Sequence, residues 1–179
     1  MKNIVSKENA MHVFLTGDVQ CGKSTALSRA LEQISRPLFG FKTLFTDRYN
    51  DNKSLYMLPA GFVGIPESKH IVAQFVDGKP QPLTQRFNEI GATLLQEAQQ
   101  HPEGLILMDE CSRFERDALD FQRERFNCLD GGIPVLGVVR QNASGWVDAI
   151  RSHPNVKLLT VTVDNRDRIP DEILRLLNL

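Results

Sequence analysis

Gly17, Gly22, Lys23 and Ser24 follow the spacing G-x-x-x-x-G-K-S, the most specific chemical pattern in the sequence. Glycine at the first two positions permits backbone angles that other side chains forbid, so successive N–H groups can point inward around an anion. Lys23 is long enough to reach the β- and γ-phosphates of a nucleotide, and the Ser24 hydroxyl is a ligand for Mg²⁺. The pattern therefore predicts a loop that binds ATP or another nucleoside triphosphate together with Mg²⁺.

The other residues of this predicted binding site are Asp18, Val19, Gln20, Cys21 and Thr25. We expect Thr25 to support the start of the helix that follows the loop. The Cys21 thiol has two interpretations: a small side chain that fills the loop, or a thiol made reactive by the neighbouring helix N-terminus. The first is the simpler one.

Asp109 and Glu110 follow the apolar run Leu105–Met108, which is typical of a buried parallel strand. We expect this strand to lie beside the strand that precedes the phosphate-binding loop, because open α/β sheets bind ligands at the carboxyl ends of their strands. Asp109 would hold Mg²⁺ directly or through water, and Glu110 would act as general base or position the attacking water. Acids at strand ends also cap helices, which is the alternative interpretation.

Several other side chains are candidates near this site. Arg113 either stabilises the γ-phosphate charge as a catalytic residue or is a surface charge at a helix start. Arg140 either contacts phosphate or pairs with an acid, and Arg166, after Asn165, is placed to stack on the base. For Trp146, helix packing is favoured over base stacking.

A further set of charged residues alternates in sign, which is typical of a solvated helix face. Its members are Arg116, Asp117, Asp120, Arg123, Glu124 and Arg125.

Strands and helices alternate along the chain, which predicts an α/β fold with a mostly parallel sheet. The expected strands are His12–Thr16, Phe41–Phe45, Leu105–Met108, Val135–Val139 and Val156–Val163. The expected helices are Thr25–Ser35, Leu83–Gln100, Phe114–Leu129, Gly145–Ser152 and Asp171–Leu177. Proline and glycine divide residues 53–82 into short runs, so we expect irregular hairpins inserted at a sheet edge within a single domain, 1–179.

The composition excludes several classes of protein. The 179 residues include 21 Lys plus Arg and 22 Asp plus Glu, so the net charge of −1 argues against nucleic acid as a partner. The sequence contains neither a membrane span nor a secretory signal. Three widely spaced cysteines indicate reduced thiols and a cytoplasmic location. We expect a monomer, with an oligomer left open.

The motifs resemble the cancer-related nucleoside-triphosphatase family. The shared segments are Gly40-Phe41-Lys42-Thr43 after the first helix, the acidic segment Asp109–Glu115, and Asn165–Leu174 near the C-terminus. The resemblance covers the chain from about Met11. It implies a three-layer fold of the P-loop NTPase type, with an antiparallel hairpin edge in this chain, and Mg²⁺-dependent hydrolysis of nucleoside triphosphates to diphosphates with loose base preference.

The sequence also departs from this family. Residues 18–21 lack the Pro-Gly that the family loop usually has, and Ser112 replaces a glycine, whereas Arg113 matches the basic position that the family fills with lysine. Arg48 lies one position later than the family pattern suggests. The chain is therefore a divergent relative, and substrate preference does not transfer with the resemblance.

Two alternative functions remain open. A small-molecule kinase would use Asp47-Arg48 near its acceptor and residues 53–82 as a flap, although the sequence has no arginine-rich lid. The other alternative is a nucleotide-dependent binding or assembly module whose slow hydrolysis resets a partner complex.

Overall fold

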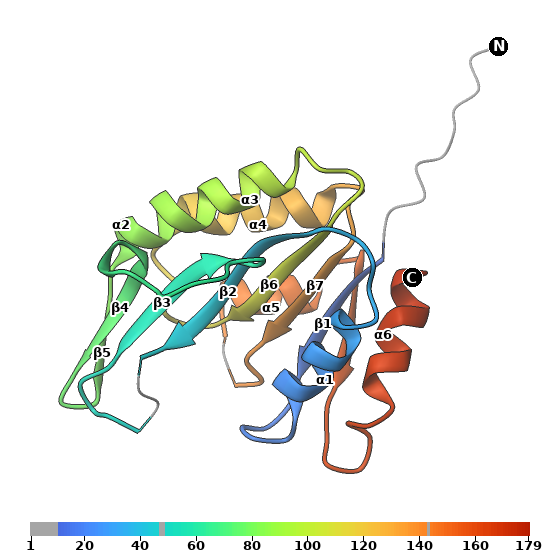
Figure 1. The fold of residues 1–179 in the computed structure, drawn as a ribbon, viewed down its shortest axis with the longest axis horizontal. Coiled ribbons are helices and arrows are strands. Elements are labelled where there is room, and N and C mark those ends of the chain that lie inside the picture. Colours follow the sequence, from blue (N-terminus) through green and yellow to red (C-terminus); the bar gives the residue numbers. More distant parts are fainter. Residues whose placement is uncertain (1–10, 47–48, 143) are drawn as a thin grey trace.

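The computed structural model describes residues 11–46, 49–142 and 144–179, and in these residues eight strands form one sheet (Figure 1). Their order is β5-β4-β3-β2-β6-β7-β1-β8. The bounds are β1 His12–Thr16, β2 Leu38–Phe45, β3 Ser54–Pro59, β4 Ile71–Val76, β5 Lys79–Pro82, β6 Leu105–Cys111, β7 Val135–Val139 and β8 Val156–Thr160. Strands β2, β6, β7, β1 and β8 are parallel, while β3, β4 and β5 pair antiparallel at one edge. The predicted sheet and its hairpin edge are confirmed.

Helices cover both faces of the sheet and make three layers (Figure 1). On one face lie α1 (Lys23–Leu31) and α6 (Ile169–Leu177). On the other lie α2 (Thr84–Arg86), α3 (Ala92–Ala98), α4 (Leu119–Asp130) and α5 (Trp146–Arg151). Within the described residues, no helix is long and apolar enough to cross a membrane.

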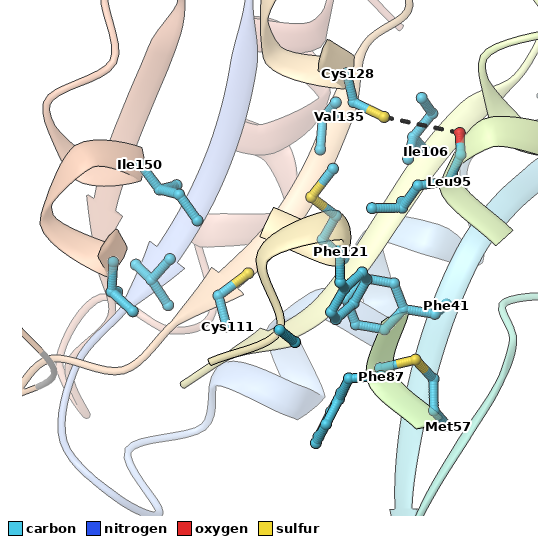
Figure 2. Packing of buried hydrophobic residues seen from close by; sticks show 14 of the residues in the cluster. Phe41, Met57, Phe87, Leu95, Ile106, Cys111, Phe121, Cys128, Val135 and Ile150 are labelled. Atoms are coloured by element: carbon cyan, nitrogen blue, oxygen red, sulfur yellow. Dashed lines mark hydrogen bonds between the residues drawn. The ribbon is translucent and has the colours of Figure 1, made fainter. Parts of the chain in front are cut away.

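Strand β1 is buried along its whole length because each face of the sheet has its own helices. Val13 and Leu15 pack on the side of α1 and α6, and Phe14 packs on the side of α3, α4 and α5. Figure 2 shows the core on the side of α3, α4 and α5, where Phe41, Phe87 and Phe121 lie close together. Truncating such a fully buried aromatic side chain to alanine costs about 3–5 kcal/mol.

The expectation that the strand of Asp109 lies beside the phosphate-loop strand is wrong, because β7 lies between β6 and β1. Two interstrand spacings, about 10 Å, therefore separate the backbones of β6 and β1. The runs Leu105–Met108 and Val135–Val139 are both continuously apolar, so their composition does not show which one borders β1.

The predicted helix Leu83–Gln100 is helical but interrupted by a wider π-turn over Phe87–Gly91. This turn brings Asn88 and Gly91 against α4. The Asn88 side-chain oxygen accepts a hydrogen bond from the backbone N–H of Phe121, at 3.1 Å. A Cβ at Gly91 would lie 2.4 Å from the Phe121 ring, so the two helices approach closely only because residue 91 is glycine.

Other element bounds differ more modestly. The predicted helix from Phe114 begins only at Leu119, since residues 112–118 form turns, and the last strand ends at Thr160 instead of Val163. Strand β2 begins at Leu38, and α1 ends at Leu31 instead of Ser35.

Candidate functional site

The loop between β1 and α1 has the backbone that its sequence predicts. Gly17 and Gly22 adopt φ angles of 139° and 107°, which side-chain-bearing residues rarely tolerate. A Cβ at Gly17 would lie 2.4 Å from the carbonyl oxygen of Val161, so the residue that follows β8 also restricts that position to glycine. Both fixed glycines are therefore required by geometry.

The Lys23 side chain folds back over this loop. Its ammonium donates hydrogen bonds to the carbonyl oxygens of Gly17 and Asp18, at 2.8 and 2.6 Å, and lies 3.8 Å from Cys21 Sγ. The loop thus holds one positive charge at its centre, where an anion would be bound. Cys21 is buried, as expected of a side chain that fills the loop.

The N-terminus of α1 carries no negative charge of its own. Gly22 precedes the helix without a side-chain cap, and the first turn contains no acidic residue. The first turns of α4 and α6, by contrast, contain Asp120 and Asp171. The positive end of the α1 dipole is therefore available to an anion, and the exposed hydroxyls of Ser24 and Thr25 lie in this first turn.

Gln20 adopts φ 64° in the same loop, a left-handed conformation that is uncommon for residues other than glycine. In the cancer-related nucleoside-triphosphatase family, which the sequence resembles, this position is usually glycine. A residue with a Cβ therefore adopts a conformation here that glycine adopts without strain. Asp18, Val19 and Gln20 are all exposed at the tip of the loop.

Asp109 and Glu110 lie at an irregularity in the sheet. Met108 pairs with Gly137 and Cys111 with Val139, so β6 has one more residue than β7 over this interval. Such a bulge bends the strand and re-aims side chains. As a result, Asp109 contacts the strand on one side of β6 and Glu110 contacts the end of the strand on the other.

Thr43 on β2 holds the Asp109 carboxylate. The Thr43 backbone N–H and hydroxyl donate to Asp109 Oδ2 at 2.8 and 3.1 Å. Burial raises the pKa of Asp109, and the two hydrogen bonds from Thr43 oppose that shift. Sequence reasoning did not nominate Thr43, although it is the fourth residue of the Gly-Phe-Lys-Thr segment.

Glu110 pairs with Arg140, which follows β7. Arg140 Nε donates to Glu110 Oε1 at 2.9 Å, and both side chains are partly exposed. Of the two interpretations of Arg140, pairing with an acid is confirmed. Arg151 on α5 donates to the carbonyl oxygens of Arg140 and Gln141, and its guanidinium also binds Asp148 Oδ1 at 2.6 Å.

The turn after Glu110 carries Arg113, which is exposed and lies 5.9 Å from the centre of the Phe114 ring. The prediction that the charged residues between Arg116 and Arg125 form a solvated helix face is wrong for two of them. Glu124 is 7% exposed, and Arg125 is completely buried. Trp146 packs 4.7 Å from the Arg125 guanidinium carbon, which agrees with helix packing.

An open pocket of about 240 Å³ adjoins the loop beside α1. It is lined by Gly22, Thr25, Ala26, Arg29, Arg166 and Asp167. Arg166 lies directly over the loop, because a Cβ at Gly22 would be 2.9 Å from Arg166 Cδ. Arg29 and Asp167 form an ion pair at 3.0 Å across the pocket lining.

Asn165 holds the segment that carries Arg166. Its amide donates to the carbonyl oxygen of Thr160, and its Oδ1 accepts from the backbone N–H of Thr162, both at 2.8 Å. Asn165 thus orders the chain after β8. The residues Asp47 and Arg48, which the kinase alternative requires, lie outside the described residues.

The chain is similar to curated nucleoside-triphosphatases. The chain is 24% identical to nucleoside-triphosphatase THEP1 of Aquifex aeolicus (strain VF5), over 93% of this chain and 99% of that protein. It is 33% identical to nucleoside-triphosphatase THEP1 of Thermofilum pendens (strain DSM 2475 / Hrk 5) over 40% of each chain.

The fold matches a solved structure as well. The crystal structure of THEP1 from the hyperthermophile Aquifex aeolicus superposes with a TM-score of 0.75, at 24% identity, over 94% of this chain and all of that one. A family model described as NTPase matches residues 12–174, which is most of the chain. The chain therefore belongs to the NTPase family.

Proposed function

We propose that this protein hydrolyses nucleoside triphosphates to nucleoside diphosphates and phosphate with the help of Mg²⁺. The observation that carries the proposal is the loop Gly17–Ser24, which surrounds the Lys23 ammonium at the uncapped N-terminus of α1. The phosphates would bind to the backbone N–H groups of residues 17–25 and to Lys23. The acidic pair Asp109 and Glu110 lies on the same sheet, near the carboxyl end of β6.

The residues present fit Mg²⁺, which prefers oxygen ligands. The Ser24 hydroxyl and the Asp109 carboxylate would hold the ion, either directly or through a bridging water molecule. Among the described residues no group of three or more His, Cys, Asp or Glu side chains forms a metal cluster. Phosphate oxygens and water would therefore complete the coordination. When bound, Mg²⁺ neutralises negative charge on the phosphate oxygens.

Glu110 is the residue placed to act on water. Its carboxylate would orient a water molecule toward the γ-phosphorus and accept a proton from it, while the bond to the β-phosphate oxygen breaks. Lys23 and the loop N–H groups would stabilise the negative charge left on the diphosphate. Arg113 would stabilise charge on the γ-phosphate oxygens, as an arginine supplied within the chain can.

The base would bind in the pocket that Arg166 lines. The planar Arg166 guanidinium would stack on the base, an interaction that any base offers through its π-face. The Arg29–Asp167 pair at the lining is exposed to solvent. Among the described residues, the polar side chains that line this pocket are exposed, and stacking without a buried hydrogen-bonding partner supports loose base preference.

The kinase alternative is less well supported. Within residues 53–82, the strands β3, β4 and β5 are hydrogen-bonded into the sheet and do not resemble a flap, and only the connection 60–70 and the turn 77–78 lie between them. The third alternative, an assembly module, would use the same nucleotide site and differ in its rate of hydrolysis.

The test is phosphate release by purified Lys23→Ala and Glu110→Gln variants. We expect both to lose at least 100-fold in kcat, about the contribution of one proton-transfer or charge-stabilising residue. Lys157→Ala and Glu97→Gln, which change exposed residues on β8 and α3, serve as matched controls and should keep the wild-type rate. If Lys23→Ala and Glu110→Gln both released phosphate like the wild type, the proposal would fail.

A further inference from the structure

Arg125 on α4 is the largest fully buried side chain among the described residues. Its guanidinium carbon lies 3.9 Å from the ring centre of Phe121, 4.7 Å from Trp146 and 5.2 Å from Phe41. Three aromatic faces therefore replace the water that usually surrounds this group. Within the described part of the chain, its Nε and Nη1 atoms have no hydrogen-bond partner.

One carboxylate compensates the buried charge. Arg125 Nη2 donates to Glu115 Oε1 at 3.2 Å, and the Glu115 side chain is only 4% exposed. Burial raises the pKa of Glu115, while the Arg125 charge acts in the opposite direction. Buried ion pairs rarely add stability, because well-packed apolar side chains of similar size do as well or better. Stability alone therefore does not explain this pair.

The second oxygen of Glu115 binds the chain next to Glu110. Glu115 Oε2 accepts hydrogen bonds from the backbone N–H and the hydroxyl of Ser112, at 3.1 and 3.0 Å. Ser112 Oγ in turn accepts from the backbone N–H of Phe114 at 3.3 Å. These bonds fix the turn that begins after Glu110 and carries Arg113.

Cys111, between Glu110 and Ser112, is anchored in the core. It lies in the same buried cluster as Phe121 and Phe41 (Figure 2). Burial raises the pKa of its thiol to about 12, so the group stays neutral. The segment after Glu110 is thus held by apolar packing at residue 111 and by the Glu115 carboxylate at residue 112.

Trp146 connects Arg125 to the other partner of Glu110. It is the first residue of α5, which follows the loop that begins with Arg140. Its indole faces the Arg125 guanidinium, and Arg140 binds the Glu110 carboxylate. Arg125 therefore contacts Glu115, which binds the turn after Glu110, and it also contacts α5, whose Arg151 donates to the carbonyl oxygens of Arg140 and Gln141.

We propose that Arg125 is a positioning residue for hydrolysis, which fixes Glu110 through Glu115 and Ser112 on one side and, on the other, through Trp146 and α5, whose Arg151 holds the backbone at Arg140. This inference rests on the proposed function. It assigns to a buried residue that touches neither nucleotide nor metal a large effect on turnover and almost none on nucleotide binding. The phosphate-binding loop follows β1, which β7 separates from β6, and none of the hydrogen bonds named above involves it.

The experiment compares Arg125→Met with Arg123→Met, and Glu115→Gln with Glu124→Gln. Arg123 lies on the same helix with its side chain 60% exposed, and Glu124 is a buried carboxylate that binds Gln96, Gln99 and Asn127. The measurements are kcat for phosphate release, the Kd of a non-hydrolysable ATP analogue, and thermal unfolding. For Arg125→Met we expect kcat to fall about 10- to 100-fold, as displacement of a reacting group by about 1 Å does, with Kd within about twofold of wild type. Glu115→Gln should shift the same way to a smaller extent, and both control variants should keep wild-type kcat.

Two outcomes overturn the proposal: wild-type kcat in folded Arg125→Met, or a loss of analogue affinity that parallels the loss of kcat. If Arg125→Met does not fold, the double variant Glu115→Met with Arg125→Met removes both buried charges at similar volume and takes its place. Low kcat with unchanged Kd in that variant supports the proposal, and wild-type kcat overturns it.

Failure of the proposed function would look different, because Lys23→Ala and Glu110→Gln would then release phosphate normally. If those two lose activity while Arg125→Met keeps it, only the positioning role is wrong.

Discussion

Thr43 on β2 holds Asp109 on β6 through two hydrogen bonds to the same carboxylate oxygen, Oδ2. The two strands are neighbours in parallel register, with Phe41 opposite Met108. Asp109 is thus anchored by β2, the neighbour of β6 that lies farther from the phosphate-binding loop. Strand β7, the other neighbour of β6, lies between β6 and β1. The Gly-Phe-Lys-Thr segment therefore serves the acidic site through its threonine.

Thr43→Val tests this anchoring, because it removes the hydroxyl donor and keeps the backbone donor. A hydrogen bond to a charged group is worth about 1.5–3 kcal/mol, so we expect kcat to fall about tenfold and the Mg²⁺ concentration for half-maximal activity to rise. The measurement is phosphate release titrated with Mg²⁺. Thr93→Val on α3, where the hydroxyl binds only the carbonyl oxygen of Glu89, is the control. An unchanged Mg²⁺ titration in Thr43→Val would show that the hydroxyl does not hold Asp109 for the metal.

Arg140→Met should separate activity from stability. The Glu110–Arg140 pair is partly exposed, so it contributes only about 0–1 kcal/mol to the free energy of unfolding. Because the pair fixes the carboxylate that we propose orients water, kcat should still fall about tenfold. Arg175→Met, which removes the exposed partner of Glu172 on α6, is the matched control for both measurements. A variant with normal kcat would show that Glu110 needs no partner.

Gln20 offers a test of the loop conformation. Left-handed backbone costs a residue with a side chain about 1–2 kcal/mol, and glycine avoids that cost while losing more entropy on folding. We expect Gln20→Gly to leave the free energy of unfolding within about 0.5 kcal/mol of wild type and to keep triphosphate affinity. Gln20→Val, with a branched Cβ, should lower both the free energy of unfolding and the triphosphate affinity. Gln81→Val on the extended edge strand β5 should change neither, and equal affinities for the glycine and valine variants at position 20 would contradict the assignment.

His12 makes stability depend on pH. Its Nε2–H donates to the carbonyl oxygen of Leu129 at 3.0 Å, and its Nδ1 accepts from the backbone N–H of Val135 at 3.1 Å, so the buried ring is neutral. Burial lowers the pKa of His12 from its ordinary value of 6.5. The unfolded chain therefore binds a proton below pH 6.5 that the folded protein does not, and stability from this residue falls as the pH falls.

Comparison with His12→Asn isolates this contribution. At pH 7.5 the variant should be less stable by about 1–3 kcal/mol, the cost of leaving a buried partner unpaired. Below about pH 6.5 that difference should shrink, because only the wild type loses stability through His12. The measurement is urea unfolding at several pH values. A difference that grows as the pH falls would mean that the folded protein binds the proton on His12.

The phosphate-binding loop could be predicted from the sequence because its chemistry is local. Gly17, Gly22 and Lys23 lie within seven residues, and the backbone angles that the loop needs leave few residue types possible. The contacts that complete the site are not local. Thr43 reaches Asp109 across 66 residues, and Arg166 lies over Gly22 only because β8 borders β1. The intervening strand β7 could not be placed because its apolar residues resemble those of β6.

The charge of Arg125 predicts an exposed side chain, whereas its position on α4 predicts a buried one. The buried residues of α4 are Phe121, Glu124, Arg125, Cys128 and Leu129, a spacing of three and four that marks one helix face. Arg125 lies four residues after Phe121 and three before Cys128, so the spacing of these two apolar residues indicates that Arg125 shares their buried helix face. A charged residue on an apolar stripe is rarely buried without a partner, and Glu115, which supplies it here, lies before the helix.

The most direct test of the central claim is nucleoside-triphosphate turnover in ¹⁸O-labelled water with no phosphoryl acceptor present. We expect the wild-type protein to form nucleoside diphosphate and phosphate in equal amounts, with one oxygen from water in each phosphate, and Glu110→Gln to form almost none. Turnover that requires an added acceptor, or equal phosphate formation by Glu110→Gln, would contradict it.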